Sequence, residues 1–218
     1  IQQSLPDDVV IEPYLDRTDL VGRAISTVEK NLIEGALIVI FVLVLFLGNL
    51  RAGLIVASAI PLSMLFALGM MNIFGVSANL MSLGAIDFGL IVDGAVIIVE
   101  ATVHHLGLRK SMNRLTQSEM DDEVFLSASK IRNSAAFGEI IILIVYIPIL
   151  TLVGVEGKMF TPMAKTVGFA ILGALILSLT YIPMMCALFL SKKVSHKKTF
   201  SDKMMDYLQG IYQPLLQK

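Results

Sequence analysis

The stretch LMSLGAIDFGLIVDGAVIIVE, residues 80–100, carries three acidic side chains in a run of apolar and small residues. Its length matches the roughly 20 residues that a helix needs to cross a bilayer. On an insertion scale Asp87 and Asp93 together cost about 5 to 7 kcal/mol, and the apolar residues of the stretch return about 3 to 7 kcal/mol. If the carboxylates faced lipid, the net free energy of insertion would be close to zero or unfavourable. We therefore expect a membrane span whose carboxylates face other helices, a cavity or a counter-charge.

The helical period sets the directions of these acids. At about 100° per residue, Asp93 and Glu100 lie about 20° apart on one face and about 10 Å apart in height. Asp87 points about 120° away from Asp93 and lies about 9 Å above it. The remaining surface allows close helix contact through small residues, namely Gly84, Ala85, Gly89, Gly94 and Ala95.

An ionisable group held inside a span is a functional candidate. Burial favours the neutral form of a carboxyl group, and a nearby Lys or metal ion favours the ionised form, so the proton exchanges as the surroundings change. This is the chemistry of a proton relay, with Asp93, Asp87 and Glu100 as its candidate residues. Two other interpretations remain open: Asp93 and Asp87 only join helices, and Glu100 is a solvated residue near the cytoplasmic boundary.

Composition places the rest of the chain in lipid as well. Of its 218 residues 56% are hydrophobic and 16% are charged, whereas soluble domains are about a quarter charged. A net charge of −1 argues against nucleic-acid binding, which needs a clustered excess of Lys and Arg. Five stretches approach the length of a span and predict an all-α polytopic membrane helix bundle: residues 32–50, 52–74, 79–99, 135–154 and 163–190.

Lys and Arg give the orientation, because the cytoplasmic side of a membrane protein carries the excess. One side holds 12 of the 17, on Arg51, a loop over residues 105–133 and the tail from Lys192, and is predicted to be cytoplasmic. Residues 1–17 then lie outside. A stripe in the tail predicts a helix that lies on the membrane surface or packs in a soluble region, through Phe200, Met204, Leu208, Ile211 and Leu215.

Two strings carry a resemblance to a known family. The first is DFGLIVDGAVIIVE, residues 87–100, and the second is GEIIILIVYIPILTLVGVEGKMFTPMAKTVGFAILGALILSLTYIP, residues 138–183. They resemble the fourth span and the fifth and sixth spans of the heavy-metal branch of the resistance-nodulation-cell division exporters, close to its cobalt-zinc-cadmium type.

The resemblance implies an organisation for the whole chain. The five spans correspond to the second to sixth of a twelve-helix transporter, so that residues 18–192 form half of its membrane domain. Residues 1–17 are the end of a periplasmic porter domain, and residues 193–218 are a cytoplasmic linker between the two membrane halves. The chain is then an excised part of a longer protein.

The resemblance also implies a function and partners. Such pumps are homotrimers in the bacterial inner membrane of Gram-negative cells, joined to a periplasmic adaptor protein and an outer-membrane channel. They export divalent heavy-metal cations in exchange for protons, so the expected ions are Zn²⁺, Co²⁺, Cd²⁺ or Ni²⁺, with Cu⁺ or Ag⁺ as further cargo, and no cofactor is expected.

Position by position, Asp93 is similar to the central proton-relay aspartate of the family, and Asp87 and Glu100 to its two other acidic positions. One departure is Ala101, which stands where the family has Asn after the glutamate. The relay of the family also uses a lysine from the second membrane half, which this chain lacks.

Three alternatives compete with metal export. Drug or lipid exporters and translocation accessory proteins of the same superfamily are the nearest, but drug exporters carry adjacent aspartates where this chain has Asp93 and Gly94. An intramembrane aspartyl protease needs two carboxylates that share one proton. Asp87 and Asp93 differ in height and direction, so we expect no enzyme.

The remaining candidate residues are more readily explained by packing or by a position at the end of a span. Met81, Met159 and Met163 are weak candidates for soft-metal ligands near the outer boundary, although methionine is also a common gap-filler. Glu139, His104 and His105 are expected at span boundaries. Cys186 is expected to be a small packing residue.

Overall fold

The computed structural model describes residues 17–77, 82, 84, 86–107 and 115–191, and the regular elements among them are all helical. Five helices are long and apolar enough to cross a membrane, which confirms the predicted all-α bundle of five spans. The elements are α1 (Arg17–Leu47), α2 (Leu50–Ile73), α4 (Phe88–Gly107), α5 (Gln117–Leu150), α6 (Gly154–Leu179) and the short α7 (Tyr181–Phe189).

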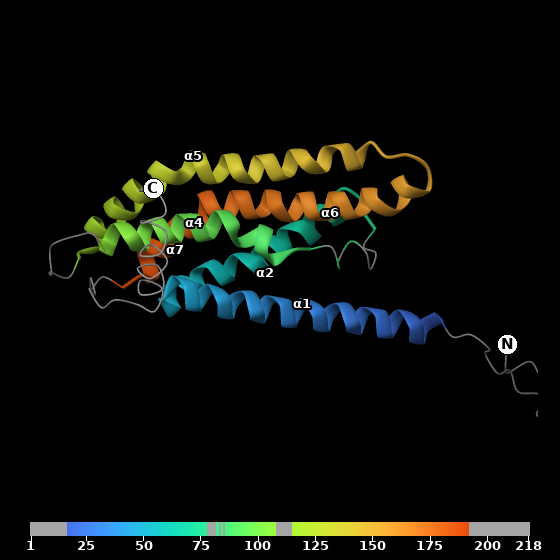
Figure 1. Ribbon diagram of the computed structural model, residues 1–218, viewed down its shortest axis with the longest axis horizontal. Coiled ribbons are helices and arrows are strands. Elements are labelled where there is room, and N and C mark those ends of the chain that lie inside the picture. Colours follow the sequence, from blue (N-terminus) through green and yellow to red (C-terminus); the bar gives the residue numbers. More distant parts are fainter. Residues whose placement is uncertain (1–16, 78–81, 83, 85, 108–114, 192–218) are drawn as a thin grey trace, which may run out of the picture.

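Helices α2, α4 and α6 form the centre of the bundle (Figure 1). In each of them 44% of the most apolar stretch is buried inside the protein, against 6% in α1 and 11% in α5. Helix α1 packs on α2 and α4, whereas α5 packs on α4 and α6 at the opposite side. The outer helices present large apolar side chains such as Phe41 and Val145, which suits a surface that faces lipid.

Consecutive spans run in opposite directions, as the short connections predict. The α1–α2 turn needs only two residues. Gly48 takes a φ of +59°, a conformation that glycine adopts without a Cβ penalty. Asn49 then caps α2, because its side-chain oxygen accepts hydrogen bonds from Arg51 N at 3.0 Å and Ala52 N at 3.5 Å. The chain therefore reverses within one hairpin.

Two glycines set the distance between neighbouring helices. A Cβ at Gly53 would lie 2.6 Å from Val44 Cγ2 across the α1–α2 hairpin, and a Cβ at Gly173 would lie 2.6 Å from the Phe66 ring of α2. Small residues are common where membrane helices approach closely. The α2–α6 contact thus depends on the missing side chain at position 173.

Two predicted boundaries differ from the structure. The third span is displaced: α4 covers Phe88–Gly107, not residues 79–99. The predicted loop over residues 105–133 is helical from Gln117 onward. There Thr116 and Glu119 form a capping box, in which Thr116 N donates to Glu119 Oε2 at 2.8 Å and Glu119 N donates to Thr116 Oγ1 at 3.4 Å. This cap starts α5 well before the apolar run.

The fifth predicted span, residues 163–190, is two helices. Helix α6 ends at Leu179, and α7 begins at Tyr181 after a break at Thr180. Pro183 explains the break, because it has no N–H for the carbonyl of Leu179 and its ring clashes with that group in a continuous helix. The predicted porter-domain end and the amphipathic tail helix lie outside the described residues.

We expect Gly173→Leu to destabilise the complete protein by about 1 to 3 kcal/mol, because the new side chain overpacks the α2–α6 contact. Gly168 lies on the same helix and has open space around its Cα, so Gly168→Leu is the matched control. Unfolding of the detergent-purified protein measures both. Equal stability of the two variants would contradict the assigned helix contact.

Candidate proton-relay site

The acidic stretch begins at a break in the helix. Residues Ile86 and Asp87 are not helical, and α4 starts at Phe88. Gly89 N donates a hydrogen bond of 2.8 Å to Asp87 Oδ1, so this carboxylate caps the first turn of α4. The prediction that Asp87 sits inside one continuous helix is wrong. The predicted 120° relation to Asp93 assumed that helix, so it has no support from the helical period.

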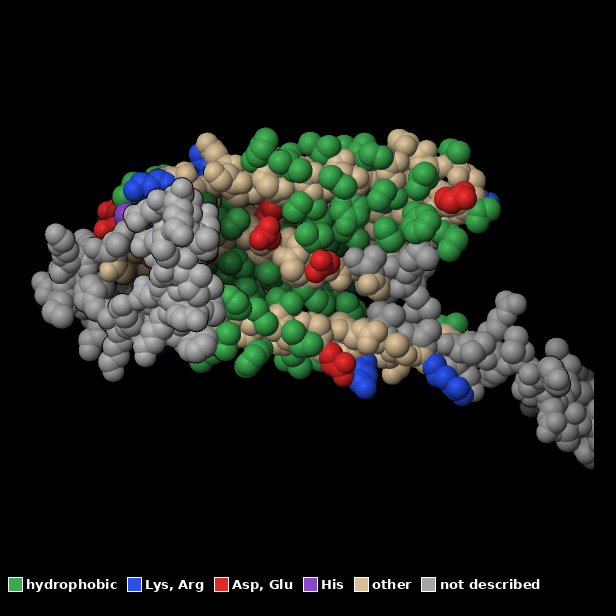
Figure 2. Space-filling model, in the orientation of Figure 1, with side chains coloured by type: hydrophobic (Ala, Val, Ile, Leu, Met, Phe, Trp, Pro, Cys, Tyr) green, Lys and Arg blue, Asp and Glu red, His purple; other side chains and the backbone are tan. Residues whose placement is uncertain are grey.

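Asp93 and Glu100 both lie on the uninterrupted helix α4, seven residues apart, so the predicted shared face is kept. Glu100 is further from the helix end than expected: seven more residues, about 10 Å, separate it from Gly107. Figure 2 shows acidic side chains over α4, in a hollow with hydrophobic side chains around it, between α1 and α5.

Asp93 and Glu100 are exposed on the described bundle. Neither forms an ion pair within the part of the chain that the structure describes. Their immediate neighbours on α4 are apolar and buried, including Val92 and Val99. The other helices therefore pack on the apolar side of α4 and leave the carboxylates of Asp93 and Glu100 uncovered.

Glu139 is a site residue that sequence reasoning placed wrongly. It lies 22 residues after the start of α5, about 33 Å along the helix, and is only 2% exposed. It is therefore no boundary residue. A Cβ at Gly94 would overlap Glu139 Oε1 and would lie 2.7 Å from its Cδ, with Ser178 Oγ 3.2 Å away. The carboxyl group fills a notch that Gly94 leaves in α4.

The signal for Glu139 is present in the sequence. An acidic residue precedes the apolar run IIILIVYIPIL, and a glycine follows the central aspartate of α4. Only the packing of α5 on α4 brings these two features together.

One ion pair joins α4 to α5 near the opposite end of α4 from Asp87. His105 Nε2 lies 2.9 Å from Glu123 Oε2, and both side chains are largely buried. His105 is in the last turn of α4, where a positive charge is favoured by the helix dipole. The histidine predicted at a boundary is thus also a contact between the two helices that hold Asp93 and Glu139.

The methionines proposed as soft-metal ligands are described only in part. Met81 lies outside the described residues, and Met159 and Met163 lie in the first turns of α6. Met71 is buried, and its sulfur accepts a hydrogen bond of 3.4 Å from Thr166 Oγ1, which is a packing role. Over the described ranges, no group of three or more His, Cys, Asp or Glu residues is placed to hold a metal ion.

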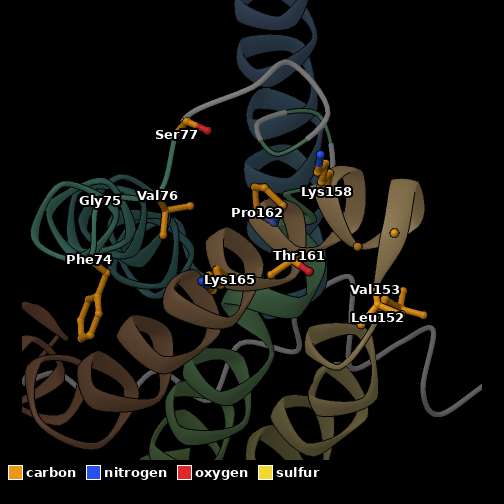
Figure 3. A pocket seen from close by; sticks show the side chains of 12 residues that line it. Phe74, Gly75, Val76, Ser77, Leu152, Val153, Lys158, Thr161, Pro162 and Lys165 are labelled. Carbon is orange, nitrogen blue, oxygen red and sulfur yellow. The ribbon is translucent and has the colours of Figure 1, made fainter.

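A cavity of about 490 Å³ opens at the outer end of the bundle (Figure 3). It lies between the end of α2, the α5–α6 connection and the first turns of α6, and Lys158 and Lys165 line it. Two ammonium groups repel a divalent cation. This cavity therefore does not suit a metal ion.

Comparisons with known proteins agree with this geometry. The AcrB/AcrD/AcrF family model matches residues 1–218. The cobalt-zinc-cadmium resistance protein CzcA of Cupriavidus metallidurans is 52% identical over all of this chain, which covers 20% of that protein. The nickel-cobalt-cadmium resistance protein NccA of Alcaligenes xylosoxydans xylosoxydans is 46% identical, again over all of this chain and 20% of the relative.

A solved structure has the same fold. The crystal structure of a heavy metal efflux pump is 42% identical, with a TM-score of 0.72 over 84% of this chain and 17% of that one. The chain spans about one fifth of the length of the curated relatives it matches. With the family model matched from the first residue to the last, the chain belongs to the AcrB/AcrD/AcrF family.

Proposed function

We propose that the chain is the membrane part of a proton-driven pump that exports divalent heavy-metal cations. The observation that carries the proposal is Asp93, a carboxylate in mid-helix on an apolar span with its side chain on the uncovered face of α4. An uncovered aspartate costs about 2.5 to 3.5 kcal/mol at the centre of a bilayer. A partner outside the described residues, such as the family's lysine, would supply the compensating charge.

The relay works by alternation between two states. With the cationic partner close, Asp93 is stable as the carboxylate; with the partner withdrawn, the apolar surroundings favour the protonated acid. Glu100 lies on the same face about 10 Å away, and Asp87 precedes the first turn of α4. Protons would pass along this row, and the rearranged helices would drive metal export elsewhere in the pump.

The names of the relatives support the cargo. CzcA is named for cobalt, zinc and cadmium, and NccA for nickel, cobalt and cadmium. We therefore propose Zn²⁺, Co²⁺, Cd²⁺ or Ni²⁺ as substrates. Cu⁺ or Ag⁺ is a second candidate, because Met159 and Met163 lie four residues apart on α6 and present two thioethers on one side of the helix.

The assembly and location are proposed from the family. The complete pump would be a homotrimer in the inner membrane of a Gram-negative bacterium, with a periplasmic adaptor protein and an outer-membrane channel. Five apolar helices support a multi-pass membrane protein. The 12 Lys and Arg residues at one side support a cytoplasmic position for the α4–α5 connection.

The alternatives receive less support. Drug or lipid export and a translocation accessory role do not explain why relatives that are 52% and 46% identical are named for metal resistance. Proteolysis needs two carboxylates on one proton. Asp87 instead caps α4 through Gly89 N, and Asp93 lies four residues beyond that glycine, so we propose no enzymatic activity.

Replacing Asp93 with Asn in the complete protein should reduce zinc tolerance of the host strain to that of a strain without the pump, because an amide carries no transferable proton. Asp122→Asn is the control, since Asp122 is an exposed carboxylate on the first turns of α5. Growth over a series of zinc concentrations measures the effect, with expression checked by immunoblot. Full tolerance in the Asp93 variant would remove the mechanism.

Two variants of Asp87 distinguish its role as a helix cap from a role in proton relay. Asn caps a helix about as well as Asp, whereas Ala lowers stability by about 0.5 to 2 kcal/mol. For a relay residue, we expect Asp87→Asn to lose zinc tolerance with an unchanged unfolding midpoint, and Asp87→Ala to lose both. If Asp87→Asn keeps full tolerance, Asp87 is a cap alone.

A further inference from the structure

Glu139 differs from the other acids of the bundle in how it is enclosed. It is the only buried acidic side chain among the described residues, and α4, α5 and α6 of this chain surround it. Asp93, in contrast, lies on an uncovered face. The surroundings of Glu139 therefore do not depend on any further part of the pump.

Neither oxygen of the Glu139 carboxyl group has a hydrogen bond of good geometry within the described structure, although Ser178 and the Gly94 backbone are polar groups close to it. Leaving a buried polar group without a partner costs free energy, and leaving an ionised group without one costs more. The site therefore accommodates the neutral acid much better than the carboxylate. A buried acid that is normally neutral is a store for one proton.

Glu139 contacts α4 at Gly94, next to the relay residue Asp93. The Glu139 carboxyl group lies against the α4 backbone in the space where any other residue would carry its Cβ. The preceding residue on α4 is Asp93, so the two carboxyl groups belong to adjoining positions of one helix contact. Two carboxyl groups that interact in apolar surroundings cannot both ionise cheaply, so they titrate as a pair.

Among the described residues, the titratable groups of the helices packed around Glu139 lie at some distance from this pair or carry no charge. Helix α6 presents Ser178 to Glu139, and its charged residues Glu156, Lys158 and Lys165 are at least 13 residues, about 20 Å, away along the helix. On α7 the titratable groups are Cys186, which is buried, and Tyr181, which donates to Ser58 Oγ of α2 at 3.2 Å. On α4, Glu100 lies six residues, about 9 Å, from Gly94.

Ser178 gives the carboxylate form a temporary donor. Its hydroxyl donates to Leu175 O at 2.9 Å and its Oγ lies beside Glu139 across Gly94. A hydroxyl proton rotates to suit its neighbours. When Glu139 ionises, this hydroxyl can turn from the backbone carbonyl to the carboxylate, so the charged state is reachable as well as the neutral one.

We propose that Glu139 is a second proton-binding carboxyl group of the transport cycle, coupled to Asp93 through the notch at Gly94. The O–H bond at Glu139 breaks and an O–H bond at Asp93 forms, and the negative charge moves the opposite way, with no other reactant. The proposal rests on the relay role of Asp93 proposed above and adds to it a proton store enclosed within this half of the membrane domain.

The test is infrared spectroscopy of the complete pump in lipid, made with isotope-labelled glutamate so that Glu and Asp carboxyl bands separate. We expect a protonated glutamate C=O band that persists above about pH 6, where ordinary glutamates are ionised. The band should vanish in Glu139→Gln. It should remain in Glu156→Gln, a matched change at an exposed residue in the first turn of α6.

Coupling gives a second readout, which does not require the Glu139 variant to fold. In Asp93→Asn the repelling charge is gone, so the pH at which the glutamate band disappears should fall by about one unit or more.

Absence of any protonated glutamate band above that pH, or the same band midpoint with and without Asp93, would overturn the proposal. The two proposals fail separately. Full zinc tolerance in Asp93→Asn removes the relay, whereas an uncoupled glutamate band beside an inactive Asp93→Asn removes only the proton store.

Discussion

The free-energy cost of a carboxylate in hydrocarbon is the constraint on which the rest of the structure depends. Helix α4 carries Asp93 and Glu100 in an apolar span, and the described helices cover its back and not its acidic face. The central position of α2, α4 and α6, with α1 and α5 outside, holds that face in place. Glycines where side chains would clash, at positions 53, 94 and 173, let the backbones come close enough.

The same constraint gives two environments for acids on neighbouring helices. In the proposed function, Asp93 takes a partner from beyond these helices, and its protonation follows the movement of that partner. Glu139 is enclosed by α4, α5 and α6, and neither of its carboxyl oxygens has a hydrogen bond of good geometry within the described structure. In the proposed function, the exposed Asp93 is the relay residue. Its extension makes the enclosed Glu139 a second proton-binding group next to it.

Much of this follows from sequence alone, because apolar length and helical period are local properties. The five spans, their antiparallel order and the shared face of Asp93 and Glu100 are of this kind. The break before α4 is not, since Asp87 stands in an unbroken apolar run and shows its capping role only through Gly89 N. Glu139 was misplaced because its burial depends on Gly94 of another helix, which no pattern within α5 contains.

The central claim is that movement of protons through the acidic face drives metal export. The most direct measurement is zinc flux in liposomes that hold the complete pump, under an imposed pH gradient, with an internal zinc indicator and a pH dye recorded together. The account predicts that the gradient drives zinc transport, that each zinc moved is matched by protons moving the other way, and that a proton ionophore stops both. Zinc flux that continues unchanged without a pH gradient would contradict it.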